Sequence, residues 1–139
     1  MLEKLEIQAV MTPFPHTVGF DQPLNVAREM MLNYNIRHLP VQKGGQLVGI
    51  ISERDVHFAL SVEKKRAEAV LVEEVYVPEP YVVPLNTPLY KVARHMANEH
   101  IGCALVTQKE KLVGIFTTVD ACRTLADVLT EQTFAGKER

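Results

Sequence analysis

The feature that most constrains the fold of this chain is an internal repeat with a period of 65 residues. Aligning residues 10–55 with residues 75–120 without a gap gives 15 identities in 46 positions, where chance matching of average compositions gives about three. Each aligned range ends in a related heptapeptide, GIISERD (Gly49–Asp55) or GIFTTVD (Gly114–Asp120). The chain therefore carries one structural unit twice.

Length, composition and charge indicate a globular protein and argue against binding to nucleic acid or membrane. The 139 residues are 47% hydrophobic and 23% charged, which is typical of a compact globular domain. Fifteen Lys and Arg against 17 Asp and Glu give a net charge of -2, without the basic excess of a nucleic-acid binder. The N-terminus lacks a basic segment before an apolar stretch, and no apolar run reaches about 18 residues. We expect a cytoplasmic protein that binds neither nucleic acid nor membrane.

The first strand and helix of each copy follow from short patterns. Thr17–Val18 is expected to be extended, and Asp21 then caps a helix whose first turn accepts Pro23. Apolar residues at i, i+3 and i+7 continue this helix as a core-facing stripe. The second copy repeats the pattern with Val82–Val83, Asn86 and Pro88.

A strand hairpin and a second helix complete each copy. The runs HLPVQ (38–42) and CALVT (103–107) predict strands, and the turns that follow lead into LVGII and LVGIF. The second helix is expected to begin near Ser52 in the first copy and near Thr117 in the second. The order strand, helix, strand, strand, helix spans about 50 residues, too few to bury a strong core alone.

These elements predict an α/β (α+β) fold with four segments. We assign residues 1–62 to the first repeat, 63–70 to a helical or solvated connector, 71–131 to the second repeat and 132–139 to a flexible tail. The last helix is expected to run through about Leu129. The two repeats together form one module.

Motifs for catalysis or metal binding are missing from the sequence. Cys103 and Cys122 lack a C-x-x-C spacing, and we interpret both as reduced structural residues. The five histidines (16, 38, 57, 95 and 100) show no ligand spacing. The paired glycines lie in a strand turn rather than in a Walker-type loop. We expect no enzyme activity, no metal and no required cofactor.

The repeated heptapeptide has two interpretations. Ser52 and Thr117 are good helix N-caps, and Asp55 and Asp120 three residues later can complete capping boxes. Alternatively, because Asp reaches back less easily than Glu or Gln, each carboxylate is free to face outward. A helix start with unpaired N–H groups suits phosphate, and a neighbouring carboxylate suits ribose hydroxyls.

The tandem copies resemble the cystathionine beta-synthase (CBS) domain pair, or Bateman module. The resemblance is carried by VMTPFPHTV, IRHLPV and LVGIISERD, and it covers about 120 residues, from roughly Leu5 to Leu125. It implies two tandem β-α-β-β-α units related by pseudo-twofold symmetry, packed through their sheets, with clefts that bind adenine nucleotides in many members. It also implies a flat homodimer built from helix faces.

The resemblance implies roles for the signature residues. Asp55 and Asp120 stand where family members hold the ribose, and Ser52 and Thr117 where they help to hold the phosphate. Arg37 stands where members such as the gamma subunit of AMP-activated protein kinase use a basic residue for phosphate; its alternative is a surface arginine at the start of a strand.

The copies differ around these positions. Arg37 and His38 align with Gly102 and Cys103, so only the first copy supplies a cation and the two clefts are not expected to be equivalent. Arg54 is either a second phosphate ligand or, as we prefer, a solvated residue at the helix start.

Two further segments resemble the lining of the adenine pocket in the family. These are Thr17–Val18 and Tyr81–Val82, whose backbone groups would read the base edge. Their side chains would enclose the base or belong to the core.

We therefore expect a stand-alone regulatory module that binds AMP, ADP, ATP or S-adenosylmethionine between its repeats and signals by conformational change to a protein target. The alternative is a dimeric interaction or scaffold module without a nucleotide ligand, in which the signature residues are only helix caps.

Overall fold

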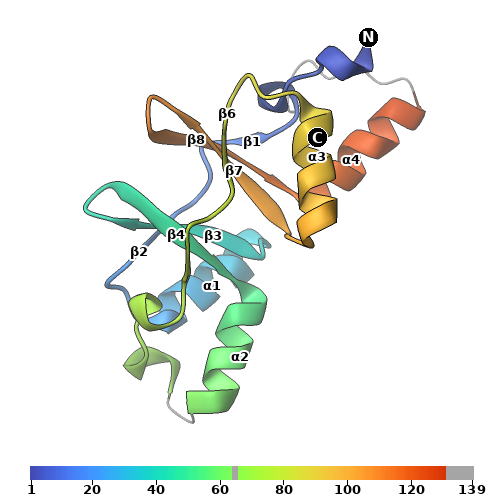
Figure 1. Cartoon of the computed structure of the whole chain (residues 1–139). Helices are drawn as coiled ribbons and strands as arrows, with labels where there is room; N and C mark the ends of the chain where they lie inside the picture. The colour runs from blue at the N-terminus through green and yellow to red at the C-terminus, as the bar shows by residue number, and fades with distance from the viewer. Residues whose placement is uncertain (64–65, 131–139) are drawn as a thin grey trace. The chain divides into compact units, whose positions relative to one another are not determined.

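The chain folds into two compact units of mixed α and β structure. The computed structural model describes residues 1–63 and 66–130, and over these it contains four α-helices and two four-stranded sheets (Figure 1). One unit is a single stretch, residues 16–80, and is called the contiguous unit below. The other joins residues 1–15 to the chain from residue 81 onward and is called the composite unit. The predicted fold class is confirmed.

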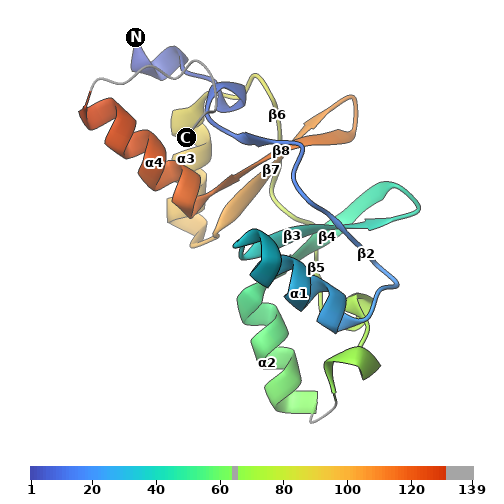
Figure 2. The ribbon, with the colours of Figure 1, turned by 180° about the vertical axis from the view of Figure 1, so that it is seen from behind.

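The contiguous unit contains the first copy of the repeat. Its elements in chain order are β2 (Val18–Gly19), α1 (Leu24–Tyr34), β3 (His38–Lys43), β4 (Gln46–Ser52), α2 (Glu53–Glu63), the 3-10 helices Ala67–Ala69 and Val72–Glu74, and β5 (Val77–Pro78). The predicted strands, the hairpin and the start of the second helix are confirmed. Helices α1 and α2 contact each other, as Figure 2 shows from behind.

The composite unit contains the second copy. Its elements are the 3-10 helices Leu2–Lys4 and Ile7–Ala9, β1 (Thr12–Pro13), β6 (Val82–Pro84), α3 (Leu89–Glu99), β7 (Cys103–Gln108), β8 (Lys111–Thr117) and α4 (Thr118–Leu129). The predicted end of the last helix at Leu129 is confirmed, while the predicted tail, 132–139, lies outside the described residues.

Both sheets have the same topology. The strand orders are β2-β3-β4-β5 and β6-β7-β8-β1, with the first pair parallel and the next two pairs antiparallel. The registers agree with the 65-residue offset, because Val18 faces Val41 as Val83 faces Val106. Each sheet lies over its own core, so the duplicated sequence folds twice in the same way.

The edge strands are exchanged between the copies, which the sequence did not reveal. Strand β5 precedes the second copy but pairs with β4 of the first, where Val77 lies opposite Ile50. Strand β1 precedes the first copy but pairs with β8 of the second, where Thr12 lies opposite Ile115. Each unit is therefore completed by the segment that precedes the other repeat.

The predicted caps of the first helices are wrong. Pro23 and Pro88, rather than Asp21 and Asn86, occupy the N-cap positions of α1 and α3, and neither helix has a side-chain cap. The helix N–H groups find backbone acceptors instead. Leu24 N donates to a carbonyl of the 66–80 segment and Leu89 N to a carbonyl of the N-terminal segment, each at 2.7 Å. Backbone carbonyls of the exchanged segments thus accept the hydrogen bonds that an Asp or Asn cap was expected to accept.

The predicted connector is less solvated than expected. Helix α2 continues to Glu63, and Val70 at the end of the connector is fully buried in the core of the contiguous unit, as is Val72 just beyond it. This segment supplies apolar area that a 50-residue copy lacks.

The signature glycine makes room for an exchanged edge strand. A Cβ on Gly49 would overlap the Tyr76 ring and the Val77 carbonyl oxygen, whereas the three atoms nearest to a Cβ on Gly114 all belong to the side chain of Met11. We predict that Gly49→Ala destabilises the protein by about 2 kcal/mol, a typical cost of overpacking. Gly114→Ala is the matched control and is expected to cost less, because a methionine side chain adapts. Urea unfolding of the two variants checks this, and equal midpoints would contradict it.

Candidate functional site

A capping box joins the end of β4 to the start of α2 in the contiguous unit. The backbone N–H of Ser52 donates to Asp55 Oδ2 at 2.9 Å, and the N–H of Asp55 donates to Ser52 Oγ at 3.1 Å. The half-buried Asp55 carboxylate accepts no other hydrogen bond from the described residues. Because an ionised carboxylate offers about four acceptor sites, most of its capacity is open.

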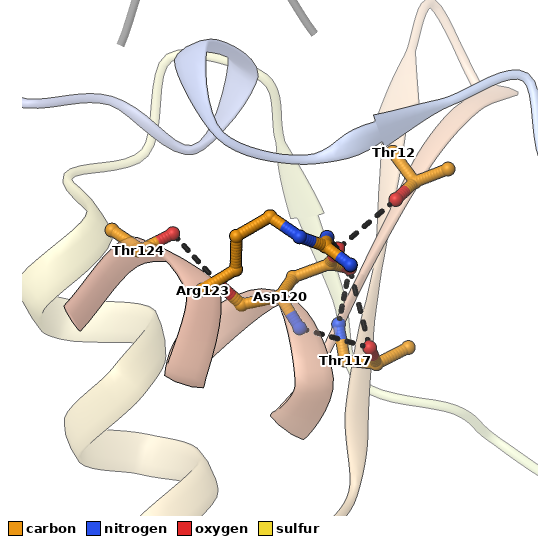
Figure 3. A network of polar contacts seen from close by, with 5 residues as sticks. All are labelled: Thr12, Thr117, Asp120, Arg123 and Thr124. Carbon is orange, nitrogen blue, oxygen red and sulfur yellow. Dashed lines mark hydrogen bonds and ion pairs between the residues drawn. The ribbon is translucent and has the colours of Figure 1, made fainter. Parts of the chain in front are cut away.

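The equivalent carboxylate in the composite unit, that of Asp120, has no acceptor site left for a ligand. Asp120 is only 4% exposed. Its Oδ2 accepts from the N–H of Thr117 at 3.0 Å and from the Thr117 hydroxyl at 3.2 Å. Its Oδ1 accepts from the hydroxyl of Thr12 at 3.1 Å and from the guanidinium of Arg123 at 2.9 Å. Figure 3 shows these groups converging on the carboxylate, so all of its acceptor sites are used.

Both observations correct the expectation that Asp would not close a capping box. The chain enters each helix in an extended conformation, with φ and ψ of -108° and 172° at Thr117, and this brings the N-cap N–H within reach of the shorter side chain. The cap interpretation is therefore right for both copies, while Asp55 also retains open acceptor sites.

Sequence reasoning missed Thr12 and Arg123, which close the second carboxylate. Their counterparts at the 65-residue offset are Val77 and Phe58, which donate no side-chain hydrogen bond. The signal that could have found them is this pair of polar-to-apolar differences within the repeat.

Arg37 and His38 lie beside the start of α2. The carbonyl of Arg37 accepts from the N–H of Glu53 at 2.9 Å, and His38 lies opposite Ser52 in the β3–β4 ladder. Arg37 is exposed and forms no ion pair with any described residue. Burial lowers the pKa of His38, the Asp55 charge opposes this shift, and the Arg37 charge adds to it. The backbone of Arg37, the backbone of His38 and the Asp55 carboxylate therefore all belong to the junction between β4 and α2.

The other expected site residues are placed as follows. Arg54 is exposed on the first turn of α2. Val18 is 3% exposed within the core, and the hydroxyl of Thr17 donates to Gln42 Oε1 at 3.3 Å. Val18 therefore has only backbone groups to offer a ligand.

The expected segment of the composite unit is Tyr81–Val82, which aligns with residues 16–17 of the first copy. Tyr81 precedes β6. Its carbonyl accepts from the N–H of Leu105 at 2.8 Å, and its ring stacks on His95 with centroids 4.1 Å apart. Burial raises the pKa of the Tyr81 hydroxyl. Val82 is 40% exposed in β6.

A surface hollow lies at the other end of the first hairpin. It is lined by residues of the β2–α1 loop and of the β3–β4 turn, including Phe20 and Lys43, whose ammonium lies 4.8 Å from the ring centroid. The hollow does not include Ser52 or Asp55.

The cysteines are free thiols, and burial raises the pKa of Cys103 to about 12. Cys103 is thus a protonated structural residue at neutral pH, while Cys122 is exposed. Within the described ranges no group of three or more His, Cys, Asp or Glu residues could hold a metal ion. None of the described helices combines the length and apolar character needed to cross a membrane.

The fold and the paired helix-start signatures define a tandem β-α-β-β-α module. A family model of the CBS domain matches the chain twice, over residues 7–62 and 72–127. The chain belongs to the CBS domain family.

Two solved structures are similar over nearly the whole chain. One is a Vibrio cholerae protein with the provisional name acetoin utilization protein (AcuB), 31% identical with a TM-score of 0.82 over 91% of this chain and 93% of that one. The other is the CBS domain pair of protein MJ0100 in complex with 5′-methylthioadenosine and S-adenosyl-L-methionine. It is 25% identical with a TM-score of 0.78 over 89% and 98% of the two chains.

Curated relatives are similar over a smaller share of their length. The inosine-5′-monophosphate dehydrogenase of Thermoplasma acidophilum is 30% identical over 125 residues, which are 89% of this chain and 23% of the dehydrogenase. The chain spans about a quarter of the length of such relatives.

The two signature aspartates are expected to differ in their contribution to stability. Asp120→Ala removes four hydrogen bonds and leaves the Arg123 guanidinium without its partner, so we predict a loss of about 3 kcal/mol. Asp55→Ala removes one hydrogen bond, with an expected loss of about 1 kcal/mol. Urea unfolding measures both. Asp21→Ala is the control, with an expected change within about 0.5 kcal/mol; equal losses for Asp55 and Asp120 would contradict the asymmetry.

His38 is expected to make stability depend on pH. Burial lowers its pKa below the ordinary value of 6.5, so the unfolded chain binds this proton more readily than the folded chain. The stability that neutral His38 contributes is complete above about pH 6.5 and is lost as the pH falls below this value. Thermal unfolding of His38→Gln should therefore lose less stability than the native chain between pH 7 and 5. The exposed His57→Gln is the control and should follow the native chain.

Proposed function

We propose that this chain is a regulatory module that binds an adenosine-containing small molecule at the start of α2. The observation that carries the proposal is the open carboxylate of Asp55 at the start of α2, to which the exposed Arg37 is joined through its backbone carbonyl. Ribose hydroxyls donate to a carboxylate, and Arg binds phosphate oxygens through a planar pair of N–H groups. The MJ0100 pair, solved with two adenosine-containing ligands, supports the ligand class.

The roles of the remaining groups follow from their positions. Ser52 fixes the helix start and offers its hydroxyl to a phosphate, while His38 can donate to the same anion once protonated. Thr17 and Val18 would contribute backbone groups to the base. Arg54, which carries no described ion pair, is assigned to the solvated surface.

Regulation would require different affinities of the ligand for two arrangements of the protein. The module would act on a protein target and would catalyse no reaction itself. We also propose a homodimer formed through helix faces, supported by exposed apolar residues on α1 and α2 such as Leu32 (80% exposed) and Val62 (57% exposed).

A scaffold module without a nucleotide is the second candidate, and a specific observation favours it. Both signatures form complete capping boxes, so a structural role explains the repeated residues without a ligand. The two candidates differ in whether an adenosine compound stabilises the protein.

We predict that one of AMP, ADP, ATP or S-adenosylmethionine raises the melting temperature. A ligand at a hundred times its Kd stabilises a protein by about 2.7 kcal/mol. Asp55→Asn keeps an acceptor for Ser52 but turns the open oxygen into an amide donor, and should weaken binding at least about tenfold, equivalent to about 1.4 kcal/mol. Calorimetric titration checks this, with the exposed Asp21→Asn as control.

Arg37→Ala tests the phosphate role within the same titrations. The loss should be larger for AMP than for adenosine, and Arg54→Ala should affect neither. A chain that none of the four ligands stabilises would favour the scaffold candidate, and equal losses for AMP and adenosine would remove Arg37 from the phosphate site.

A further inference from the structure

The two copies fill equivalent positions with opposite chemistry. Arg123 follows Asp120 by three residues on α4, as Phe58 follows Asp55 on α2, so each lies on the same helix face as its aspartate. Thr12 on β1 and Val77 on β5 also correspond, because their ladder partners, Ile115 and Ile50, are related by the repeat offset.

In the composite unit the polar pair, Thr12 and Arg123, binds the signature carboxylate. Thr12 and Arg123 donate to Asp120 Oδ1, the oxygen that the capping box leaves unused. A ribose would have to donate to this same oxygen. Because the ion pair is charge-assisted and Asp120 is nearly fully buried, releasing it costs more than ribose hydroxyls, which already bond to water, can return.

In the contiguous unit the same positions are apolar and exposed. Phe58 is 68% exposed and Val77 46% exposed. They leave the acceptor sites of Asp55 open, and an exposed aromatic ring offers a surface on which a base can stack.

We infer that Arg123 and Thr12 occupy the carboxylate oxygen of Asp120 that a ribose would need. The module therefore binds one adenosine-containing ligand per chain, at Asp55 and not at Asp120. This inference rests on the proposed function and adds the residues that determine which copy binds. Phe58 and Val77 leave the Asp55 carboxylate open to a ligand. Arg123 and Thr12 occupy the Asp120 carboxylate and prevent binding there.

The exchange of these pairs between the copies tests the inference. The first variant, Arg123→Phe with Thr12→Val, keeps both Thr117 contacts to Asp120 and should open the composite unit. The second variant, Phe58→Arg with Val77→Thr, should close the contiguous unit. AMP and S-adenosylmethionine are the probes, with stoichiometry from calorimetric titration. Amide chemical shifts of residues 52–55 and 117–120 locate the ligand.

The native chain should bind one equivalent, with shifts confined to residues 52–55. The first variant should bind a second equivalent, with new shifts at residues 117–120, and the second variant should lose at least tenfold in affinity. If the first variant does not fold, the native stoichiometry and the second variant still decide the question.

Failure of the inference can be told apart from failure of the proposed function. Two equivalents bound by the native chain, or shifts at residues 117–120 alone, would overturn the inference while leaving a ligand-binding module. If the native chain binds neither probe but the first variant binds one equivalent at residues 117–120, the closing role of Arg123 and Thr12 stands and the proposed function fails. If neither chain binds, both are overturned.

Discussion

The reciprocal hydrogen bonding between a hydroxyl residue and the aspartate three positions later organises both halves of this protein. In each copy it fixes the point at which an extended strand becomes a helix. Helix N–H groups that would otherwise lack partners are satisfied there. Because the carboxylate is held at this junction of strand and helix, its remaining acceptor sites face the residues that neighbour the junction. The difference between the copies is therefore a difference in neighbours, not in the motif itself.

Neighbouring residues thus decide whether one signature is a structural element or a binding site. Asp120 Oδ1 accepts from two donors, Thr12 on the N-terminal strand, 108 residues away in sequence, and Arg123 on the next turn of the same helix. Asp55 has a valine and a phenylalanine at the same positions, together with Arg37 and His38, which the second copy lacks. A duplicated module can in this way keep one fold twice and assign ligand binding to a single copy.

Much of the fold could be predicted because local patterns and the repeat agreed with each other. The hairpins, the helix stripes and the helix starts at Ser52 and Thr117 followed from spacing and turn residues. The edge strands β1 and β5 could not be predicted, since each has two residues and pairs with a copy distant in sequence. The same exchange explains the failed caps at Asp21 and Asn86, because backbone carbonyls from those distant segments satisfy the helix ends.

The candidate site was predictable only in part, for a related reason. The signature identifies where a carboxylate stands, but its open or closed state depends on Thr12, which is 108 residues away from Asp120. Such a contact has no local signal. It becomes visible only when the two copies are compared after their edge strands are known.

The exchanged edge strands also set an order of events during synthesis. Residues 16–80 form one continuous stretch, so the contiguous unit has all of its strands once that stretch has left the ribosome. The composite unit needs the first fifteen residues and the chain from residue 81 onward at once. The partner of its strand β1 is β8, which is made about 100 residues later, and domains generally fold as units during synthesis. The unit with the open carboxylate therefore has all of its strands available before the unit that contains Arg123.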